Sequence, residues 1–416
     1  MMNLFLSRKI SAFATSAASR TKKPARLILL GLLLSALHPS LVAIAPGAAS
    51  PFSTMVDESV AVPAEIAGHV MFVNVMVNGH GPFRVMVDTG CSFTLVSPEF
   101  ADAVGAFALD DEDEFMTARN GLGDPTDVRR VMLGSIELGS VRFEGVLAAV
   151  SDSFEKLSVI EGRRIDGALG FSLFHDLYFG LDFPNRRLLL GNRWPENAPP
   201  IRASLPVTEH ADVPFVHVQI QDTSVEVMID TGANQALQLP ADLASSLQWK
   251  VKPRTGSLVA VIGEIGRQGI GRLAGRLSLG NLQQVEPLAV ISAGLPSLGL
   301  RSLERYCVIF HPAENRMWLC DADPAPLMPT AERSIGLNLY SDRGGMRIAG
   351  VIPDSPAAEA NLAPGALVTQ IEEQPATSWS HDKVDQWIAS HTSVALVVAD
   401  SVGERALTLR VWDLVP

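Results

Sequence analysis

The chain has 416 residues, which is long enough for two or three domains of ordinary size. Hydrophobic residues make up 47% of the sequence and charged residues 19%, a composition typical of globular proteins with apolar cores and not of disordered chains. The formal net charge of −12 argues against nucleic acid as a partner, because phosphate binding requires clustered lysine and arginine.

Residues 1–49 are predicted to form an export signal. Six basic residues precede the first acidic one, and residues 27–37 (LILLGLLLSAL) form an apolar run of signal-peptide length. The small residues that follow are compatible with cleavage after Ala49, and an uncleaved membrane anchor over residues 27–45 is the alternative. Both alternatives place the rest of the chain outside the cytoplasm.

A repeat with a period of 142 residues (230 − 88) organises the middle of the chain. The first copy reads FRVMVDTGCSFTLVS around Asp88, and the second reads VEVMIDTGANQALQLP around Asp230. Each predicts a strand, a tight turn and a second strand. The two copies then share, in order, a glycine-rich segment (residues 120–124 and 262–266), an apolar strand ending at Gly139 or Gly280, a strand around Gly170 or Gly299, and a terminal hairpin.

The chain has three cysteines and no Cys/His cluster with the spacing of metal ligands, so a structural metal site is not expected. The acid–base chemistry described below needs no cofactor. Cys307 and Cys320 flank the predicted hairpin YCVIFHPAENRMWLC. They could form a disulfide in an oxidising compartment or remain two buried thiols, because spacing alone does not fix the register. The acidic run at residues 110–114 (DDEDE) is expected to be a solvated loop.

Two Asp-Thr-Gly turns in matching frames can perform acid–base chemistry. Two carboxylates a few ångströms apart cannot both ionise cheaply, so they share one proton. The ionised carboxylate accepts a proton from an attacking water, while the protonated one donates to the oxygen of a carbonyl. Glycine lets the backbone turn tightly beside the carboxylate, and the threonine hydroxyl can brace one loop against the other. A single Asp-Thr-Gly would be an ordinary β-turn.

The order of these landmarks resembles the retropepsin-like and pepsin-like aspartic proteases, and the stretch IDGALGFSLFHDLYFGLDFPNRRLLL looks most like the bacterial retropepsin-like members. The resemblance covers roughly residues 65–319. It implies a mainly β, bilobal fold with one lobe at residues 50–196 and the other at residues 197–322. It also implies an aspartic-type endopeptidase that acts on proteins or peptides.

The resemblance also implies the roles of individual residues. Asp88 and Asp230 match the catalytic aspartates. The residues matching the active-site support are Thr89, Gly90, Thr231 and Gly232. Those matching the flaps that cover the substrate are Asn120, Gly121, Leu122, Gly123, Ile262, Gly263, Glu264, Ile265 and Gly266. The sequence departs from the family at Cys91, where serine or alanine is usual, and its second half is the more degenerate.

A linker rich in proline and alanine is predicted at residues 323–333, followed by a third unit at residues 334–416. The motif SPAA, a later Pro-Gly and the helix HDKVDQWIASH make this unit resemble a PDZ domain. Such domains bind an extended peptide or a C-terminus at a sheet edge. The residues expected at that site are Ile335, Gly336, Leu337, Asn338 and Leu339. The alternative is a small β domain that only packs against the protease lobes.

These features predict an exported aspartic endopeptidase, located in the bacterial periplasm or anchored to the inner membrane and facing it. Its PDZ-like domain would recruit substrate or regulate access. The alternative is a non-catalytic pseudo-protease that serves as a peptide-binding scaffold. The presence of both Asp88 and Asp230 favours the enzyme.

Overall fold

The computed structural model describes residues 52–54, 59–109, 115–119, 125–261, 264–320, 325–401 and 403–416. The predicted export signal, the acidic run at 110–114 and part of the predicted linker therefore lie outside the described residues. Among the described residues, no helix is long and apolar enough to cross a membrane.

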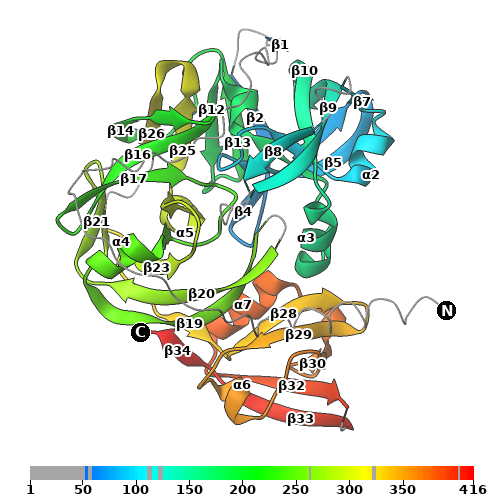
Figure 1. The fold of residues 1–416 in the computed structure, drawn as a ribbon, viewed down its shortest axis with the longest axis vertical. Coiled ribbons are helices and arrows are strands. Elements are labelled where there is room, and N and C mark those ends of the chain that lie inside the picture. Colours follow the sequence, from blue (N-terminus) through cyan, green and yellow to red (C-terminus); the bar gives the residue numbers. More distant parts are fainter. Residues whose placement is uncertain are drawn as a thin grey trace, which may run out of the picture. The chain divides into compact units, whose positions relative to one another are not determined.

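The first lobe is built on a ten-stranded sheet whose main path runs β1-β10-β6-β11-β5-β4-β9-β7 (Figure 1). Its strands are β1 (Phe52–Thr54), β3 (Glu65–Ala67), β4 (Val70–Val77), β5 (His80–Asp88), β6 (Thr94–Val96), β7 (Phe107–Ala108), β8 (Phe115–Arg119), β9 (Pro125–Leu138), β10 (Val141–Val150) and β11 (Gly167–Gly170). The helices are α2 (Pro98–Ala103), α3 (Ser153–Glu161) and the 3-10 turn η1 (Phe171–Phe174). Helix α2 begins where the Ser97 hydroxyl accepts a hydrogen bond from the Phe100 amide, with Pro98 at its first position.

The second lobe repeats this topology in a second ten-stranded sheet, ordered β19-β20-β23-β18-β24-β17-β16-β21-β22, with β15 paired to β16. Its strands are β15 (Thr208–His210), β16 (Val213–Ile220), β17 (Thr223–Ile229), β18 (Leu237–Leu239), β19 (Trp249–Val261), β20 (Glu264–Leu273), β21 (Arg276–Leu279), β22 (Leu282–Val285), β23 (Leu288–Ile291) and β24 (Ser297–Leu298). The helices are α4 (Ala241–Ser246) and α5 (Leu300–Leu303). Strand β11 runs parallel to β5, and β24 runs parallel to β17 in the same way.

A six-stranded sheet joins the two lobes in the order β14-β26-β25-β12-β13-β2. Its strands are β2 (Val60–Pro63), β12 (Tyr178–Asp182), β13 (Arg187–Gly191), β14 (Ile201–Pro206), β25 (Cys307–His311) and β26 (Arg316–Cys320), with the turn η2 (Pro312–Glu314) between the last two. The terminal hairpin of each repeat thus pairs with the other, through β12 and β25. Phe179 and Phe310 stack across this junction with ring centroids 5.1 Å apart, and both side chains are fully buried.

Cys307 and Cys320 lie directly opposite each other on β25 and β26. Both are buried free thiols, which is the second of the two alternatives that their spacing left open. Burial raises the pKa of both thiols, to about 12 for Cys320, so neither carries appreciable thiolate at neutral pH.

The third unit has its own hydrophobic cluster and a six-stranded sheet ordered β28-β29-β30-β32-β33, with β31 paired to β30. A separate two-stranded pair holds β27 beside β34. The strands are β27 (Glu332–Ser334), β28 (Leu337–Asp342), β29 (Gly345–Val351), β30 (Leu367–Ile371), β31 (Gln374–Pro375), β32 (Ser393–Asp400), β33 (Gly403–Arg410) and β34 (Trp412–Val415), and the helices are α6 (Pro356–Glu359), η3 (Ala376–Ser378) and α7 (His381–Ser390). With strands dominating all three units, the predicted mainly β architecture is confirmed.

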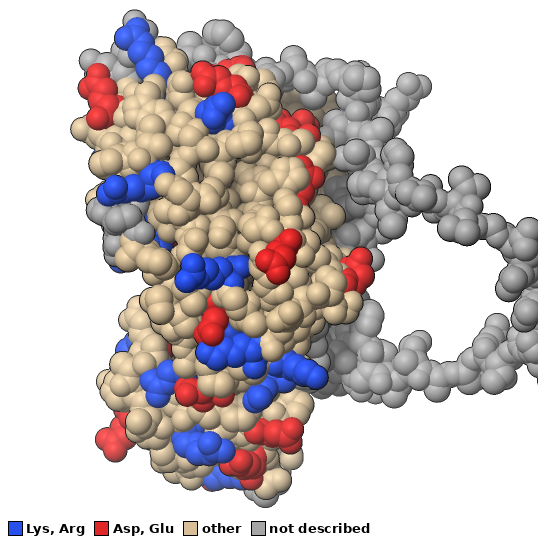
Figure 2. Space-filling view, turned by 90° about the vertical axis from the view of Figure 1, so that its left-hand side faces the viewer, with Lys and Arg blue, Asp and Glu red and all other residues tan. Residues whose placement is uncertain are grey.

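Figure 2 shows acidic and basic side chains interspersed over one face of the molecule. The excess of acidic residues in the sequence is therefore not gathered into a single field on this face.

Replacing Phe310 with alanine is expected to destabilise the protein by about 3–5 kcal/mol, because it removes a fully buried ring from the sheet that joins the lobes. Urea unfolding of the purified chain measures this. Phe107→Ala is the matched control, because the Phe107 ring is 63% exposed and its loss should change stability by less than about 0.5 kcal/mol. Equal losses in the two variants would contradict the central position of the joining sheet.

Candidate active site

The two predicted catalytic aspartates lie at equivalent positions in the two lobes. Asp88 ends β5, where it pairs with Gly170 of the neighbouring parallel strand β11. Asp230 follows β17 directly, and its amide donates to the Leu298 carbonyl of β24 at 3.0 Å. Buried valine and isoleucine side chains anchor both strands in the core, so each aspartate projects from a rigid element.

Both carboxyl groups face one site between the lobes. A Cβ atom added to Gly90 would lie 2.6 Å from the Asp230 Oδ1 atom. A Cβ atom added to Gly232 would clash with the Asp88 carboxyl group in the same way. Each Asp-Thr-Gly turn therefore packs against the aspartate of the other turn, and only glycine allows that approach.

The two threonines lock the turns together through four buried hydrogen bonds. The Thr89 hydroxyl donates to the Ile229 carbonyl at 2.6 Å and accepts from the Thr231 amide at 3.1 Å. The Thr231 hydroxyl donates to the Val87 carbonyl at 2.9 Å and accepts from the Thr89 amide at 3.0 Å. This is the bracing role that the sequence resemblance implied for Thr89 and Thr231.

The glycines behind the turns also lie in equivalent frames. A Cβ atom on Gly170 would lie 2.7 Å from the Phe93 Cα atom, and one on Gly299 would lie 2.8 Å from the Ala233 carbonyl oxygen. After each glycine, the next amide donates to the fourth residue of the active-site motif: Phe171 to the Cys91 carbonyl at 2.8 Å, and Leu300 to the Ala233 carbonyl at 2.9 Å. The repeat therefore extends to the hydrogen bonds that hold the loops.

The two carboxyl groups differ in their hydrogen-bond donors. Asp88 accepts from the Gly90 amide at 2.9 Å and from the Cys91 thiol at 3.0 Å. Asp230 accepts from the Gly232 amide at 3.0 Å, and the residue that corresponds to Cys91 is Ala233, which has no side-chain donor. The extra donor stabilises negative charge on Asp88.

Burial raises the pKa of both carboxyl groups, because it penalises the charged forms. The negative charge of Asp88 raises the pKa of Asp230 further, whereas the Cys91 thiol lowers that of Asp88. Burial and the Asp88 charge hold the pKa of the Cys91 thiol well above its ordinary value, so the thiol keeps its proton and remains a donor. The pair therefore favours one shared proton, with Asp88 ionised and Asp230 protonated.

The strands that flank the predicted flap segments pair with each other, β8 with β9 and β19 with β20. Asn120, Gly121, Leu122, Gly123, Ile262 and Gly263 are outside the described residues. Glu264, Ile265 and Gly266 form the start of β20, where they pair with β19. Their contact with substrate stays a prediction.

The described residues contain no group of three or more histidine, cysteine or acidic side chains that could hold a metal ion. The acidic run at residues 110–114 lies outside them.

In the third unit, the predicted peptide-binding residues lie at the start of an edge strand. The Ile335 side chain is buried in the core, so only its backbone can face a ligand. Gly336 has a φ of +88° and packs against Ser355, which excludes a side chain at that position. Leu337, Asn338 and Leu339 begin β28, which lies at the end of its sheet.

One buried acidic residue, which supports the strand beside Asp88, was not predicted from the sequence. Asp166 is buried, and its carboxylate accepts from the Arg84 amide at 2.8 Å and from the Arg164 guanidinium. It fixes the start of β11 against β5. The signal for Asp166 in the sequence is the Asp-Gly of IDGALG, since the second repeat has Pro-Ser at the equivalent positions and so lacks the acidic residue.

Comparison with known proteins agrees with this geometry. Residues 73–173 match the family model of aspartyl proteases, and residues 327–399 match the PDZ domain model. The chain carries an aspartyl protease domain and a PDZ domain. The predicted resemblance to aspartic proteases with a C-terminal PDZ domain is confirmed at this level.

Two similar proteins come from fungi. The DNA damage-inducible protein 1 of Cryptococcus neoformans is 29% identical over 123 residues, which cover 30% of this chain and 26% of that protein. The protein of the same name from Chaetomium globosum is 28% identical over 122 residues, covering 29% of this chain and 25% of the relative. The chain thus spans about a quarter of the length of the curated relatives it matches. The expected likeness to bacterial members in particular gains no support from them.

Replacing Thr89 with valine is expected to cost about 2–4 kcal/mol of stability, because the Ile229 carbonyl and the Thr231 amide lose their buried partner. Urea unfolding measures the loss, and peptide cleavage should fall with it. Thr89→Ser keeps the hydroxyl and is the matched control. A valine variant as stable as the serine variant would show that these hydrogen bonds do not hold the turns.

Replacing Cys91 with alanine is expected to raise the pKa of Asp88, because its thiol donor is lost. The acid limb of the pH–rate profile, which requires one ionised carboxylate, should then move to higher pH. Cys91→Ser, which supplies a hydroxyl donor, should not show this shift. Superimposable profiles for the alanine and serine variants would contradict the role of the thiol.

Proposed function

We propose that the chain is an aspartic endopeptidase in which a single chain supplies both catalytic aspartates. The reciprocal hydrogen bonds of Thr89 and Thr231 carry this proposal, because they place Asp88 and Asp230 in equivalent frames within one site. The family match covers residues 73–173 of the first lobe, and the repeat extends the same geometry to the second.

The arrangement supports a mechanism without a covalent intermediate. Ionised Asp88 takes a proton from a water whose oxygen attacks the carbonyl carbon of the peptide bond. Protonated Asp230 donates its proton to the carbonyl oxygen, giving a tetrahedral gem-diol. Asp88 then returns a proton to the amide nitrogen, and Asp230 takes one back from a gem-diol hydroxyl. The C–N bond breaks, leaving a carboxylic acid and an amine, with one water consumed.

The proposed substrates are proteins or peptides, and the PDZ domain would bind a peptide or a C-terminus to recruit substrate or regulate access. An exported location, in the periplasm or at the inner membrane and facing it, belongs to the proposal as well. The basic and apolar composition of residues 1–49 supports it.

Replacing Asp88 or Asp230 with asparagine is expected to lower cleavage of an unfolded protein substrate by about 10³-fold or more, because each variant removes one partner of the acid–base pair. The same assay from pH 3 to 10 should show the wild-type rate falling as pH rises through the pKa of Asp230, which burial and the Asp88 charge raise to about 8. At that point the acid partner loses its proton.

Asp222→Asn is the control, since Asp222 is exposed at the turn between β16 and β17. The cleavage rate should also rise linearly with enzyme concentration, as expected when one chain holds the whole site. Full activity in either asparagine variant would refute the two-aspartate mechanism. No cleavage by the wild type at any pH would favour a peptide-binding scaffold instead.

A further inference from the structure

The PDZ domain has two elements that can hold an extended peptide. Strand β28 lies at the edge of its sheet, and a peptide can add to such an edge through main-chain hydrogen bonds. Val384 and Ile388 of helix α7 belong to the same hydrophobic cluster as Leu337 and Leu339 of β28. An apolar side chain of a bound peptide would pack between these two elements, which form the walls of what we call the PDZ groove.

A segment of the protease domain lies against the far end of β28. Helix α3 contacts β28, and Gly162 ends α3 in the left-handed conformation, with a φ of +66°. A Cβ atom on Gly162 would lie 2.9 Å from the Ser341 Cβ atom and closer still to its hydroxyl oxygen. No side chain fits between the helix end and the strand at this point.

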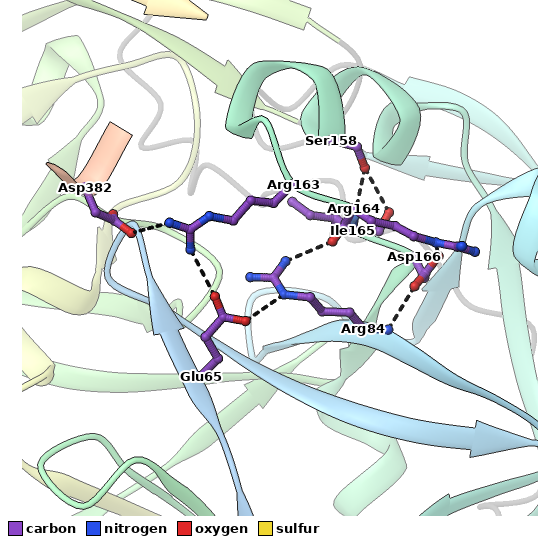
Figure 3. Close-up of polar contacts among 8 residues, drawn as sticks. All are labelled: Glu65, Arg84, Ser158, Arg163, Arg164, Ile165, Asp166 and Asp382. Carbon is purple, nitrogen blue, oxygen red and sulfur yellow. Dashed lines mark hydrogen bonds and ion pairs between the residues drawn. The ribbon is translucent and has the colours of Figure 1, made fainter. Parts of the chain in front are cut away.

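The same protease segment also contacts helix α7, which forms the other wall of the groove. Figure 3 shows the Arg163 guanidinium between Asp382 of α7 and Glu65 of the protease lobe, at 3.2 Å and 2.9 Å. The second Asp382 oxygen accepts from the Gly68 amide at 2.7 Å. Burial raises the pKa of the Glu161 carboxyl, while among the nearby groups of α7 the His381 ring lowers it and the carboxylates of Asp382 and Asp385 raise it. Residues 161–163 thus contact or face both β28 and α7.

We propose that residues 161–163 of the protease domain close the far end of the PDZ groove, which then accepts only a short C-terminal peptide segment. This inference rests on the peptide-binding role proposed above for the PDZ domain. A ligand that pairs with the whole of β28 binds only after the end of α3 has moved away.

The register sets the length of the segment. A C-terminal carboxylate held by backbone amides near Gly336 places the last ligand residue beside Leu337, so the ligand runs antiparallel to β28. Opposite residues pair one to one, and Ser341 lies four positions beyond Leu337 (341 − 337). About four ligand residues therefore fit before the chain reaches Gly162. The ligand has a free carboxylate and an apolar last residue, because the groove walls carry leucine, valine and isoleucine.

Peptide binding to the full chain tests the proposal. The probes are fluorescein-labelled tetrapeptides ending in valine, leucine or phenylalanine with a free carboxylate, and octapeptides with the same last four residues. Fluorescence anisotropy is measured with the Asp88→Asn chain, so that the result does not depend on cleavage. The octapeptide should bind within about threefold of the tetrapeptide, because its added residues gain no strand pairing.

Two variants in the same background open the groove. Gly162→Ala pushes β28 away from α3, and Arg163→Ala removes the ion pair to Asp382. In both, the octapeptide should bind at least about tenfold tighter than the tetrapeptide, because the added residues can now pair with β28. Amidation of the last carboxyl group should weaken every peptide.

Each variant has a matched control in the first lobe. Gly105→Ala introduces the same left-handed strain at the end of α2, with a φ of +60° and no atom within 4 Å of the new Cβ. Arg142→Ala removes an arginine that pairs with Glu137 and Glu144. Both should behave like the Asp88→Asn chain. The proposal is overturned if the octapeptide already binds about tenfold tighter in that chain, if the two opening variants match their controls, or if no peptide binds any of the chains.

Discussion

The reciprocal hydrogen bonds between Thr89 and Thr231 are the constraint on which the rest of the structure depends. Each hydroxyl bonds both a carbonyl and an amide of the opposite turn, so separating the turns would leave buried polar groups unpaired at about 1–3 kcal/mol each. The glycines that follow the threonines lie against the aspartates of the opposite turns. Gly170 and Gly299, on the strands behind the turns, are packed so closely that no larger residue fits there either. The turns, the carboxyl pair and the topology of the lobes form one geometrical unit.

The sequence contained most of this unit because its determinants are local. Alternating apolar residues predict the strands, and Asp-Thr-Gly predicts the turns wherever it occurs. The six-stranded sheet could not be predicted in the same way. The sequence predicts the terminal hairpins, but the pairing of β12 with β25 depends on the contact between two lobes that are far apart in the sequence. The register that places Cys307 opposite Cys320 could not be predicted either, because it depends on the conformation of the turn between β25 and β26.

The chemistry of the site was predictable in kind but not in detail. Two equivalent frames predict two equivalent carboxyl groups, yet Cys91 gives Asp88 a donor that Asp230 lacks. The resemblance drew attention to Cys91, and only the structure shows the direction of its thiol. The contacts of Arg163 were invisible in the sequence, because Asp382 lies 219 positions away and ion pairs leave no periodic pattern.

A polar chain runs from the PDZ domain toward the active site, from Asp382 through Arg163 and Glu65 to Arg84 of β5 (Figure 3). The Glu65 side chain is 49% exposed and that of Arg163 is 34% exposed, so each of their ion pairs contributes about 0–1 kcal/mol. The link from Arg84 to β11 does not depend on these ion pairs. The Arg84 amide donates a hydrogen bond to the buried Asp166 carboxylate whether or not the Arg84 side chain is paired with Glu65.

Breaking the ion pairs of Arg163 would therefore change the interaction energy too little to move Asp88. The position of Asp88 is instead set by the backbone hydrogen bonds that join β5 to β11. The pKa values of Asp88 and Asp230 are accordingly set by burial and by the donors and charges of the two turns themselves.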